Sequence, residues 1–152
     1  MAVFSRRAVL QWDGEVREGS GEVAAGIGAF TVGAIFPSIA GEPAGKTTPE
    51  ELLAASHATC YGIGLRSLIA RRGGHARRVS VTATKTAEKG PQGIRLQSSH
   101  LTGIVEGLEG IDESQLQQLA RDTEERCTIS VTIRAAVPVS SEIRIADTPA
   151  AH

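Results

Sequence analysis

The segment with the clearest start and stop is TTPEELLAASHATCYGIGLRSLIARRGG, residues 47–74, and it constrains the fold more than any other part of the chain. Its T-P-E-E box begins at Thr48, a typical N-cap, and continues with a proline at the first helical position and Glu51 at the third. A Gly-Gly pair at 73–74 is a typical helix stop. The pattern predicts one long helix over about residues 48–72.

This predicted helix carries little side-chain bulk. Alanine and glycine recur on several of its faces, so that other elements can approach it closely. We therefore expect a central, well-buried helix. One of its faces repeats at three- and four-residue spacing and consists of Leu52, Leu53, Ser56, Cys60, Ile63 and Ser67.

Strand patterns surround this helix in blocks. Residues 1–46 hold short apolar runs separated by Asp-Gly and Gly-Ser-Gly turn signals, which favour hairpins, and they end in a Pro/Gly-rich loop. Apolar and polar residues alternate over about 78–106, with a Gly-Pro turn signal near the middle. Blocks of strands and helices, rather than a strict alternation of the two, favour a single α+β domain over residues 1–152.

A second helix is predicted over about residues 112–127. Asp112 is a typical N-cap, and Gln115 completes a second capping box three residues later. The apolar face of this helix continues to Cys127, which we therefore expect to point inward at the helix's end.

The C-terminal segment, residues 128–146, is ambiguous. Its β-branched residues favour a strand over 128–136, whereas a proline interrupts the pattern directly afterwards. We expect the last residues, 147–152, to be a frayed tail.

Net charge and the N-terminal residues limit the classes of partner and compartment. The formal net charge of −1 argues against a nucleic-acid-binding surface, which usually shows a basic excess. The start MAVFSRRAVLQW lacks the apolar core of a signal peptide, and no stretch approaches the roughly 18 apolar residues of a membrane span. We therefore expect a cytoplasmic protein without nucleic-acid or membrane partners, in a compartment where structural disulfides are rare.

The two cysteines, Cys60 and Cys127, are the residues most able to carry chemistry. They are too far apart in sequence for a C-x-x-C motif, but each falls on the inward face of its predicted helix. Two such thiols can meet in a shared core and cycle between dithiol and disulfide. Two buried, inert thiols that pack as small hydrophobes would explain the same pattern. The pattern alone leaves both interpretations open.

Other kinds of site find less support in the sequence. His57 and Cys60 put two possible ligands on adjacent turns, but zinc needs three or four, and His75, His100 and His152 show no compatible spacing. A nucleophilic His57–Cys60 pair would lack an identifiable helper Asn or Asp. No Gly-rich segment matches a phosphate-binding loop or a dinucleotide fingerprint.

Three segments, TTPEELLAASHATC, ERCTIS and QWDGEVREGSGEV, together resemble the osmotically inducible protein C and organic hydroperoxide reductase (OsmC/Ohr) family. The first is similar to the family's helix start and first cysteine. The second is similar to its second cysteine segment, and the third to its N-terminal hairpin. The resemblance covers roughly residues 6–146, which is nearly the whole domain.

The resemblance implies an α+β fold in which antiparallel sheets wrap around two long central helices of an intertwined homodimer, with two sites at the interface. It implies a thiol peroxidase that reduces organic hydroperoxides under oxidative stress, with no metal, haem or flavin. Its site residues would be the peroxidatic Cys60, the resolving Cys127, Arg17 as stabiliser of thiolate and peroxide, and Glu50 as the carboxylate that orients Arg17. For residues 128–136 it implies a short helix, and we adopt that prediction.

The chemistry suits these residue types, because only a thiolate attacks a peroxide and a guanidinium stabilises it without losing its own charge. The Cys60 thiolate would become a sulfenic acid, and Cys127 would condense with it to a disulfide. An external dithiol would reduce that disulfide, and the resemblance suggests a lipoyl-carrying protein or a small dithiol. The apolar Leu53 and Ile63 would favour alkyl peroxides over hydrogen peroxide. His57 is expected to be an interior, structural histidine.

The spacing of Glu50 and Cys60 sets a geometric condition. They are ten residues apart (60 − 50), which is about 15 Å on a straight helix. An arginine from the same chain could hardly touch both, so we expect Arg17 and Glu50 to come from the partner subunit, or the helix start to be bent. Two alternatives to a peroxidase stay open: a non-catalytic dimer that binds a small apolar ligand in the same pocket, and an interaction domain with inert cysteines.

Overall fold

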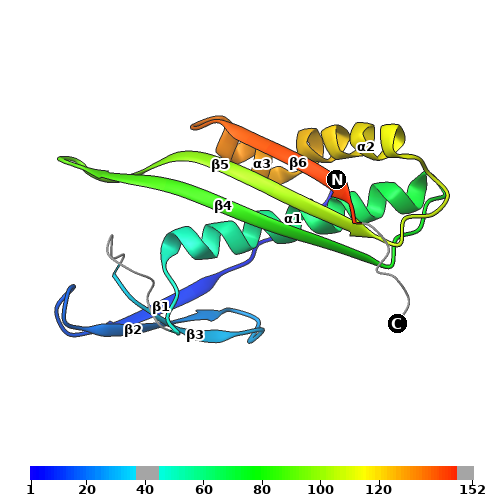
Figure 1. The fold of residues 1–152 in the computed structure, drawn as a ribbon. Helices are drawn as coiled ribbons and strands as arrows, with labels where there is room; N and C mark the ends of the chain where they lie inside the picture. Colours follow the sequence, from blue (N-terminus) through cyan, green and yellow to red (C-terminus); the bar gives the residue numbers. More distant parts are fainter. Residues whose placement is uncertain (37–44, 147–152) are drawn as a thin grey trace, which may run out of the picture. The chain divides into compact units, whose positions relative to one another are not determined.

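The computed structural model describes residues 1–36 and 45–146. Most of the expected Pro/Gly-rich loop and the expected tail at 147–152 lie outside the described residues. The chain forms two compact units, Met1–Leu52 and Leu53–His152. Figure 1 labels the helices and strands of both units.

The first unit is built on a three-stranded antiparallel sheet in the order β1-β2-β3. Its strands are β1 at Ala8–Asp13, β2 at Ser20–Ala25 and β3 at Thr31–Ala34. The predicted Asp-Gly turn is confirmed, because Gly14 follows β1 with φ of 87°, a left-handed conformation that glycine adopts without strain. Residues 14–19 connect the two strands of this hairpin.

α1 runs from Pro49 to Arg71 and begins in the first unit. Thr48 caps it as predicted, because the Glu51 N–H donates to the Thr48 hydroxyl at 3.3 Å. The return half of the predicted capping box is replaced by another contact. The carboxylate of Glu51 accepts a hydrogen bond from the hydroxyl of the buried Thr47 at 3.0 Å. Gly73, with φ of 77°, follows the end of the helix.

The second unit contains a sheet in the order β4-β5-β6, with β4 at Arg78–Gly90, β5 at Gly93–Glu106 and β6 at Val139–Ile145. β4 and β5 form a long antiparallel hairpin, as the alternating pattern predicted. β6 departs from the expected antiparallel arrangement and pairs with β5 in parallel. A parallel neighbour requires a long crossover, and residues 107–138 supply it.

This crossover contains α2 at Glu113–Arg126 and α3 at Thr128–Arg134. The capping box of α2 is confirmed in both halves: the Gln115 N–H donates to the Asp112 carboxylate at 2.8 Å, and the Asp112 N–H donates to the Gln115 side chain at 2.9 Å. α3 confirms the short helix that the family resemblance implied, against the strand propensity of the same residues. Cys127 ends α2 and caps α3.

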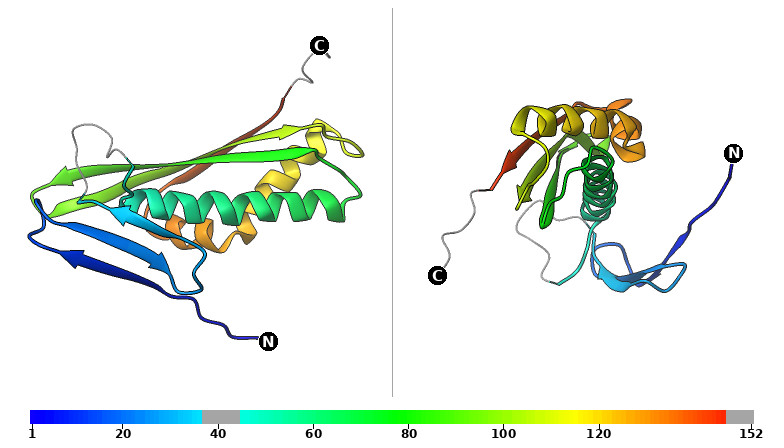
Figure 2. Two further views of the ribbon diagram at one scale, coloured as in Figure 1. Left: turned by 90° about the horizontal axis from the view of Figure 1, so that it is seen from below. Right: turned by 90° about the vertical axis from the view of Figure 1, so that its right-hand side faces the viewer.

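The helices of the second unit cover one face of its sheet (Figures 1 and 2). None of the helices in the described ranges is long and apolar enough to cross a membrane. The core between helices and sheet includes Tyr61, Leu65, Ile69, Leu101, Val105, Leu116, Leu119, Ala120 and Ile143.

The buried face of α1 differs from the face that the sequence suggested. The buried residues are His57, Tyr61, Leu65 and Ile69, which recur at four-residue spacing. Ile63, on the expected face, is 67% exposed. Within one chain α1 is therefore buried on one side only, because the sheet and the other two helices of the second unit cover a single stripe of it.

Candidate functional site

The structure brings the two cysteines together in the second unit. Cys60 on α1 and Cys127 at the junction of α2 and α3 line one cavity of about 420 Å³. Both are free thiols, and they lie close enough for each to shift the pKa of the other. Cys60 is half-buried, whereas Cys127 is only 4% exposed. A reactant that enters the cavity therefore meets Cys60 first.

The surroundings of the two thiols favour ionisation of Cys127. Burial raises the pKa of Cys60, and its contact with the Cys127 thiol raises it further. Burial acts in the same direction on Cys127, but hydrogen bonds from Cys60, from Ser130 and from the Ile129 N–H outweigh it and lower the pKa of Cys127. The Ser130 N–H lies 3.4 Å from the Cys127 sulfur. Within this unit, the negative charge is therefore more stable on Cys127 than on Cys60.

A buried polar network lies beside Cys127. His57 is fully buried, as expected of an interior histidine, with Ser99 Oγ 3.1 Å from its Nδ1 and Ser130 Oγ 2.7 Å from its Nε2. The Lys85 ammonium donates to Ser99 Oγ at 2.6 Å and also hydrogen-bonds to His57 Nδ1. Burial and the neighbouring Lys85 lower the pKa of His57 to about 4. Burial also lowers the pKa of Lys85.

Sequence reasoning missed Lys85, although a signal was present. Val79, Val81 and Ala83 mark the inward face of β4 by their alternation, and Lys85 is the next position on that face. Its partner in the sheet is Ser99, a buried position of β5. A charged residue that continues an inward-facing apolar row is unusual, because burying an ammonium is costly without hydrogen-bond partners.

Arg17 and Glu50 both lie in the first unit. Arg17 is exposed in the β1–β2 loop, and Glu50 is half-buried in the first turn of α1. The described part of the chain contains no ion pair between them. The loop is tight at Gly19, whose N–H donates to the Glu15 carbonyl at 2.6 Å and where an added Cβ would overlap the Asp13 carbonyl oxygen. The roles of Arg17 and Glu50 stay predictions.

The two residues expected to bind substrate lie differently with respect to the thiols. Ile63 lines the cavity that contains Cys60 and Cys127, next to Arg71 and Arg126. Leu53 is absent from the described lining of this cavity. The pocket wall beside the thiols therefore mixes apolar surface with two guanidinium groups.

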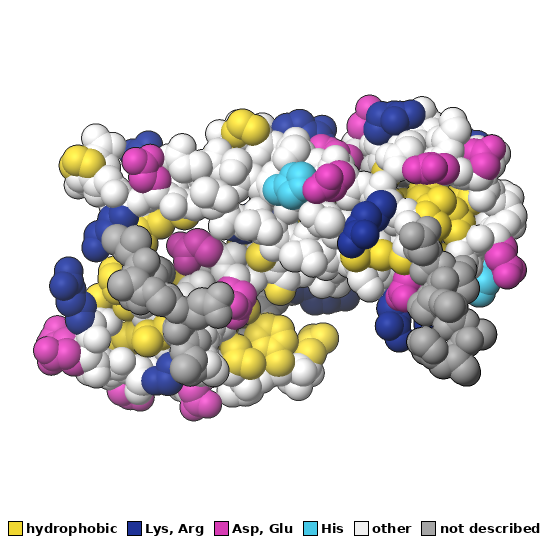
Figure 3. Space-filling view, in the orientation of Figure 1, with side chains coloured by type: hydrophobic (Ala, Val, Ile, Leu, Met, Phe, Trp, Pro, Cys, Tyr) yellow, Lys and Arg dark blue, Asp and Glu magenta, His cyan; other side chains and the backbone are white. Residues whose placement is uncertain are grey.

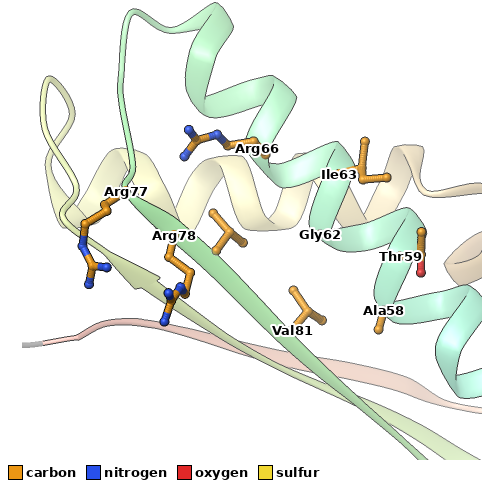
Figure 4. A pocket seen from close by; sticks show the side chains of 9 residues that line it. Ala58, Thr59, Gly62, Ile63, Arg66, Arg77, Arg78 and Val81 are labelled. Atoms are coloured by element: carbon orange, nitrogen blue, oxygen red, sulfur yellow. The ribbon is translucent and has the colours of Figure 1, made fainter.

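A second cavity, of about 510 Å³, lies along another side of α1 and contains neither thiol among its described lining residues. Figure 4 shows Arg66, Arg77 and Arg78 gathered at one end of it and small side chains of α1 along its length. Glu106 pairs with Arg77 at 2.9 Å and with Arg78 at 3.7 Å, and Arg66 donates to a backbone carbonyl. These guanidinium groups have structural partners, so we assign no chemistry to this cavity.

The first unit holds a separate cavity of about 410 Å³ and an apolar surface. The cavity is lined by apolar side chains only: Leu10, Trp12, Val16, Val23, Ala34, Ile35, Phe36, Pro49 and Leu52. Apolar side chains also gather on the surface of this unit (Figure 3). The exposed ones include Val9, Leu10, Val16 and Ile27.

Metal binding gains no support from the arrangement of side chains. Among residues 1–36 and 45–146, no group of three or more His, Cys, Asp or Glu is placed to hold a metal ion. His57 and Cys60 therefore have no third ligand of these types in the described part of the chain. The side chains around Cys60 instead present thiols, hydroxyls and a histidine that is already hydrogen-bonded.

We compared the chain with sequence profiles of known families and with known proteins. Residues 41–142 match the sequence profile of the family described as OsmC-like protein. The chain is 22% identical over 139 residues to a protein of Escherichia coli (strain K12) named peroxiredoxin OsmC, across 91% of this chain and 96% of that protein.

Solved structures with the same fold cover almost the full length of the chain. One is an organic hydroperoxide resistance protein OsmC from Legionella pneumophila, with a TM-score of 0.73, 22% identity, and coverage of 94% of this chain and 98% of that one. Another is an organic hydroperoxide resistance protein from Elizabethkingia anophelis, with a TM-score of 0.76, 19% identity, and coverage of 95% and 99%. A third, from Vibrio cholerae, is an OsmC-like protein of unknown function, with a TM-score of 0.76, 16% identity, and coverage of 93% and 100%. The expected OsmC/Ohr-like α+β fold is confirmed.

Proposed function

Since the chain belongs to the OsmC-like protein family, which supports a peroxiredoxin-like redox role, we propose that it is a thiol-dependent peroxidase that reduces organic hydroperoxides to alcohols. The observation that carries this proposal is that the Cys60 and Cys127 thiols line one cavity, close enough for each to shift the pKa of the other. Two free thiols placed in this way can form a disulfide and be reduced again, whereas inert packing does not require them to share a cavity.

In the first step the Cys60 thiolate attacks an oxygen of the hydroperoxide. A sulfur–oxygen bond forms, the oxygen–oxygen bond breaks, and the alkoxide leaves and takes a proton to become the alcohol. The exposure of Cys60 supports its assignment as the attacking residue, because Cys127 is almost fully buried. Ile63 provides apolar surface beside the attacked peroxide.

In the second step Cys127 attacks the sulfenic sulfur of Cys60, which gives a disulfide and water. An external dithiol then reduces the disulfide by thiol–disulfide exchange, in which the thiol with the lower pKa leaves more readily. Cys127 has the lower pKa of the pair, so the dithiol should attack the more exposed Cys60 sulfur. A small dithiol or a lipoyl-carrying protein is the proposed reductant, and the cytosol, which keeps thiols reduced, is the proposed compartment.

Ionisation of Cys60 requires a cation directly beside its sulfur, and Arg71 and Arg126, which line the same cavity, are not hydrogen-bonded to it. Burial and the Cys127 contact hold the pKa of Cys60 above its ordinary value. Arg17, oriented by Glu50, is the proposed source of this charge, because a guanidinium beside a thiol stabilises its thiolate. α1 is one uninterrupted helix across Glu50 and Cys60, so these residues are about 15 Å apart along its axis. We therefore assign Arg17 and Glu50 of each site to the partner of a homodimer.

The exposed apolar residues support such a dimer. The sheet of the first unit has three short strands, and side chains such as Val9 and Leu10 are more than half exposed. Contiguous exposed apolar surface usually marks an interaction site, and small isolated sheets are seldom stable. The small residues on the open side of α1 would also allow a second copy to approach closely. Sedimentation analysis should give twice the mass of 15.9 kDa for the chain.

Counting free thiols tests the peroxidase directly. The reduced protein is mixed with tert-butyl hydroperoxide, and its thiols are titrated under denaturing conditions. We expect two thiols lost per subunit in the wild type, one thiol still present in Cys60→Ser, and restoration of both wild-type thiols by a dithiol. Unchanged thiols in the wild type would exclude catalysis by this pair.

A second candidate function is binding of a small apolar ligand without catalysis. The wholly apolar cavity of the first unit favours this candidate. In that case the protein would bind an apolar fluorescent probe at the Trp12 end of the cavity while its thiols stay unchanged by peroxide. Quenching of the single tryptophan by the probe would report this binding.

A further inference from the structure

In the buried network beside Cys127, the direction of each hydrogen bond follows from the Lys85 ammonium. An ammonium group can only donate hydrogen bonds. Lys85 donates to Ser99 Oγ at 2.6 Å and contacts His57 Nδ1. Since the Ser99 oxygen accepts from Lys85, its own proton is free to point at Nδ1 as well. Both neighbours of His57 Nδ1 are donors, so Nδ1 is the acceptor nitrogen of the ring.

The tautomer of His57 then orders the rest of the chain of hydrogen bonds. With Nδ1 as acceptor, a neutral His57 carries its proton on Nε2 and donates it to Ser130 Oγ, 2.7 Å away. The Ser130 hydroxyl proton is thereby free to donate towards the sulfur of Cys127: the Ser130 N–H lies 3.4 Å from that sulfur, and the Ser130 side chain is among the groups that lower the pKa of Cys127. A continuous line of donors runs from Lys85 through His57 and Ser130 to one thiol.

We propose that Lys85, His57 and Ser130 form a chain of hydrogen-bond donors that stabilises the thiolate of the resolving cysteine, Cys127, for its attack on the Cys60 sulfenic acid. The inference rests on the proposed function, whose peroxidatic step it leaves to Arg17. Ser130 touches the reacting sulfur, whereas Lys85 and His57 are positioning residues that act through it. No other cation in the described part of the chain is linked to Cys127 by such a line of hydrogen bonds.

The donor chain serves the disulfide-forming step. The Cys127 thiol gives up its proton to solvent, and the resulting thiolate, stabilised by the Ser130 donors, attacks the sulfur of Cys60–SOH. The sulfur–sulfur bond forms and the sulfur–oxygen bond breaks, so that the Cys60 sulfur is reduced and the Cys127 sulfur is oxidised. The departing hydroxide takes one proton from solvent and leaves as water.

Several other titratable groups also face Cys127, and each could affect its ionisation. Cys60 and Tyr61 face it from α1, and burial raises the pKa of Tyr61 to about 12, so its phenol stays neutral near pH 7. Glu124 of α2 acts on Tyr61 but is paired with Arg134 at 3.7 Å. Arg71 and Arg126 line the same cavity but are not hydrogen-bonded to either thiol. Lys85 interacts with Cys127 electrostatically as well as through the network.

The ionisation of Cys127 can be measured without peroxide. In a Cys60→Ser background, the ultraviolet absorbance of the thiolate reports Cys127 alone as the pH is raised. We expect Lys85→Met to move the midpoint of this titration upward by about one pH unit, which is about tenfold less thiolate near neutral pH. Lys89→Met is the matched control, because Lys89 lies exposed on the same strand, and its midpoint should equal that of the background.

The resolving step is measured separately in the protein with both cysteines. After one equivalent of tert-butyl hydroperoxide, disulfide formation near pH 7 should be about tenfold slower in Lys85→Met, and it should approach the wild-type rate in alkaline solution, where Cys127 ionises without help. A slower rate that alkaline pH does not restore would indicate a purely structural role and overturn the proposal. So would a Cys127 midpoint that is the same in Lys85→Met and Lys89→Met.

A second variant keeps the inference testable if Lys85→Met fails to fold. Ser130→Ala removes the hydroxyl that links His57 to the sulfur and keeps the backbone N–H at 3.4 Å. It should move the Cys127 midpoint in the same direction, and an unchanged midpoint would overturn the proposal. Failure of the proposed peroxidase would appear differently, as wild-type thiols that survive peroxide while the Cys127 midpoint still responds to Lys85.

Discussion

Acidification should destabilise this protein through His57, and the size of the effect can be worked from the structure. The ring is fully buried and neutral, and Lys85 lies against its acceptor nitrogen. Protonation in the folded state would bury a second cation beside the first, which is why the pKa of His57 falls to about 4. In the unfolded chain the same histidine has its ordinary pKa of 6.5.

The direction of this pH dependence follows from the number of protons that His57 binds in the folded and unfolded states. Between about pH 6.5 and pH 4 the unfolded chain binds a proton at His57 and the folded protein does not, so the free energy of unfolding falls as the pH falls. Each pH unit in this window removes about 1.4 kcal/mol, which gives a total of about 3 kcal/mol. Above pH 6.5 and below pH 4 the histidine contributes no further dependence on pH.

Urea unfolding at a series of pH values measures this loss. His57→Gln removes the titrating ring, and its overall stability will differ, so the comparison is between slopes of unfolding free energy against pH. The wild type should lose about 3 kcal/mol more than His57→Gln across the window. His75→Gln, at an exposed histidine, is the matched control for replacing a histidine by glutamine. Equal slopes for wild type and His57→Gln would refute the assignment of a neutral, buried His57.

Three further predictions concern the thiols, the core and a helix cap. Cys127→Ser should stop at the Cys60 sulfenic acid after peroxide, detected as a dimedone adduct by mass spectrometry; an adduct on no residue would contradict the assigned roles. Leu65→Ala should lower the free energy of unfolding by about 2–5 kcal/mol in urea titrations, because Leu65 is fully buried; a loss under about 1 kcal/mol would mean that this core is not formed. Asp112→Ala should cost about 1 kcal/mol, since it removes the cap of α2, whereas Asp112→Asn should retain most of it.

Local signals in the sequence predicted the elements whose causes are local. The cap at Thr48, the capping box of Asp112 and the Asp-Gly turn before Gly14 depend on hydrogen bonds and backbone angles within a few residues, and all three are present. The alternation along β4 and β5 likewise needs only neighbours in sequence. For α3 local propensity favoured a strand, and family resemblance corrected it, because capping by Cys127 and burial of Ile133 outweigh that propensity.

The chemistry of the site was decided by contacts that no local pattern contains. The sequence indicated that Cys60 and Cys127 face inward, but their meeting in one cavity depends on how α1 packs against the α2–α3 junction. The parallel pairing of β6 and the buried face of α1 also depend on this packing.

Lys85 illustrates the difference most clearly. The sequence by itself determined that this lysine continues an inward-facing row of β4. Only the tertiary structure decided that it meets His57 and Ser99 there, because these residues come from α1 and β5 and are joined only by folding. A buried ammonium is stable where hydrogen-bond acceptors surround it, and such acceptors are assembled from distant parts of the chain.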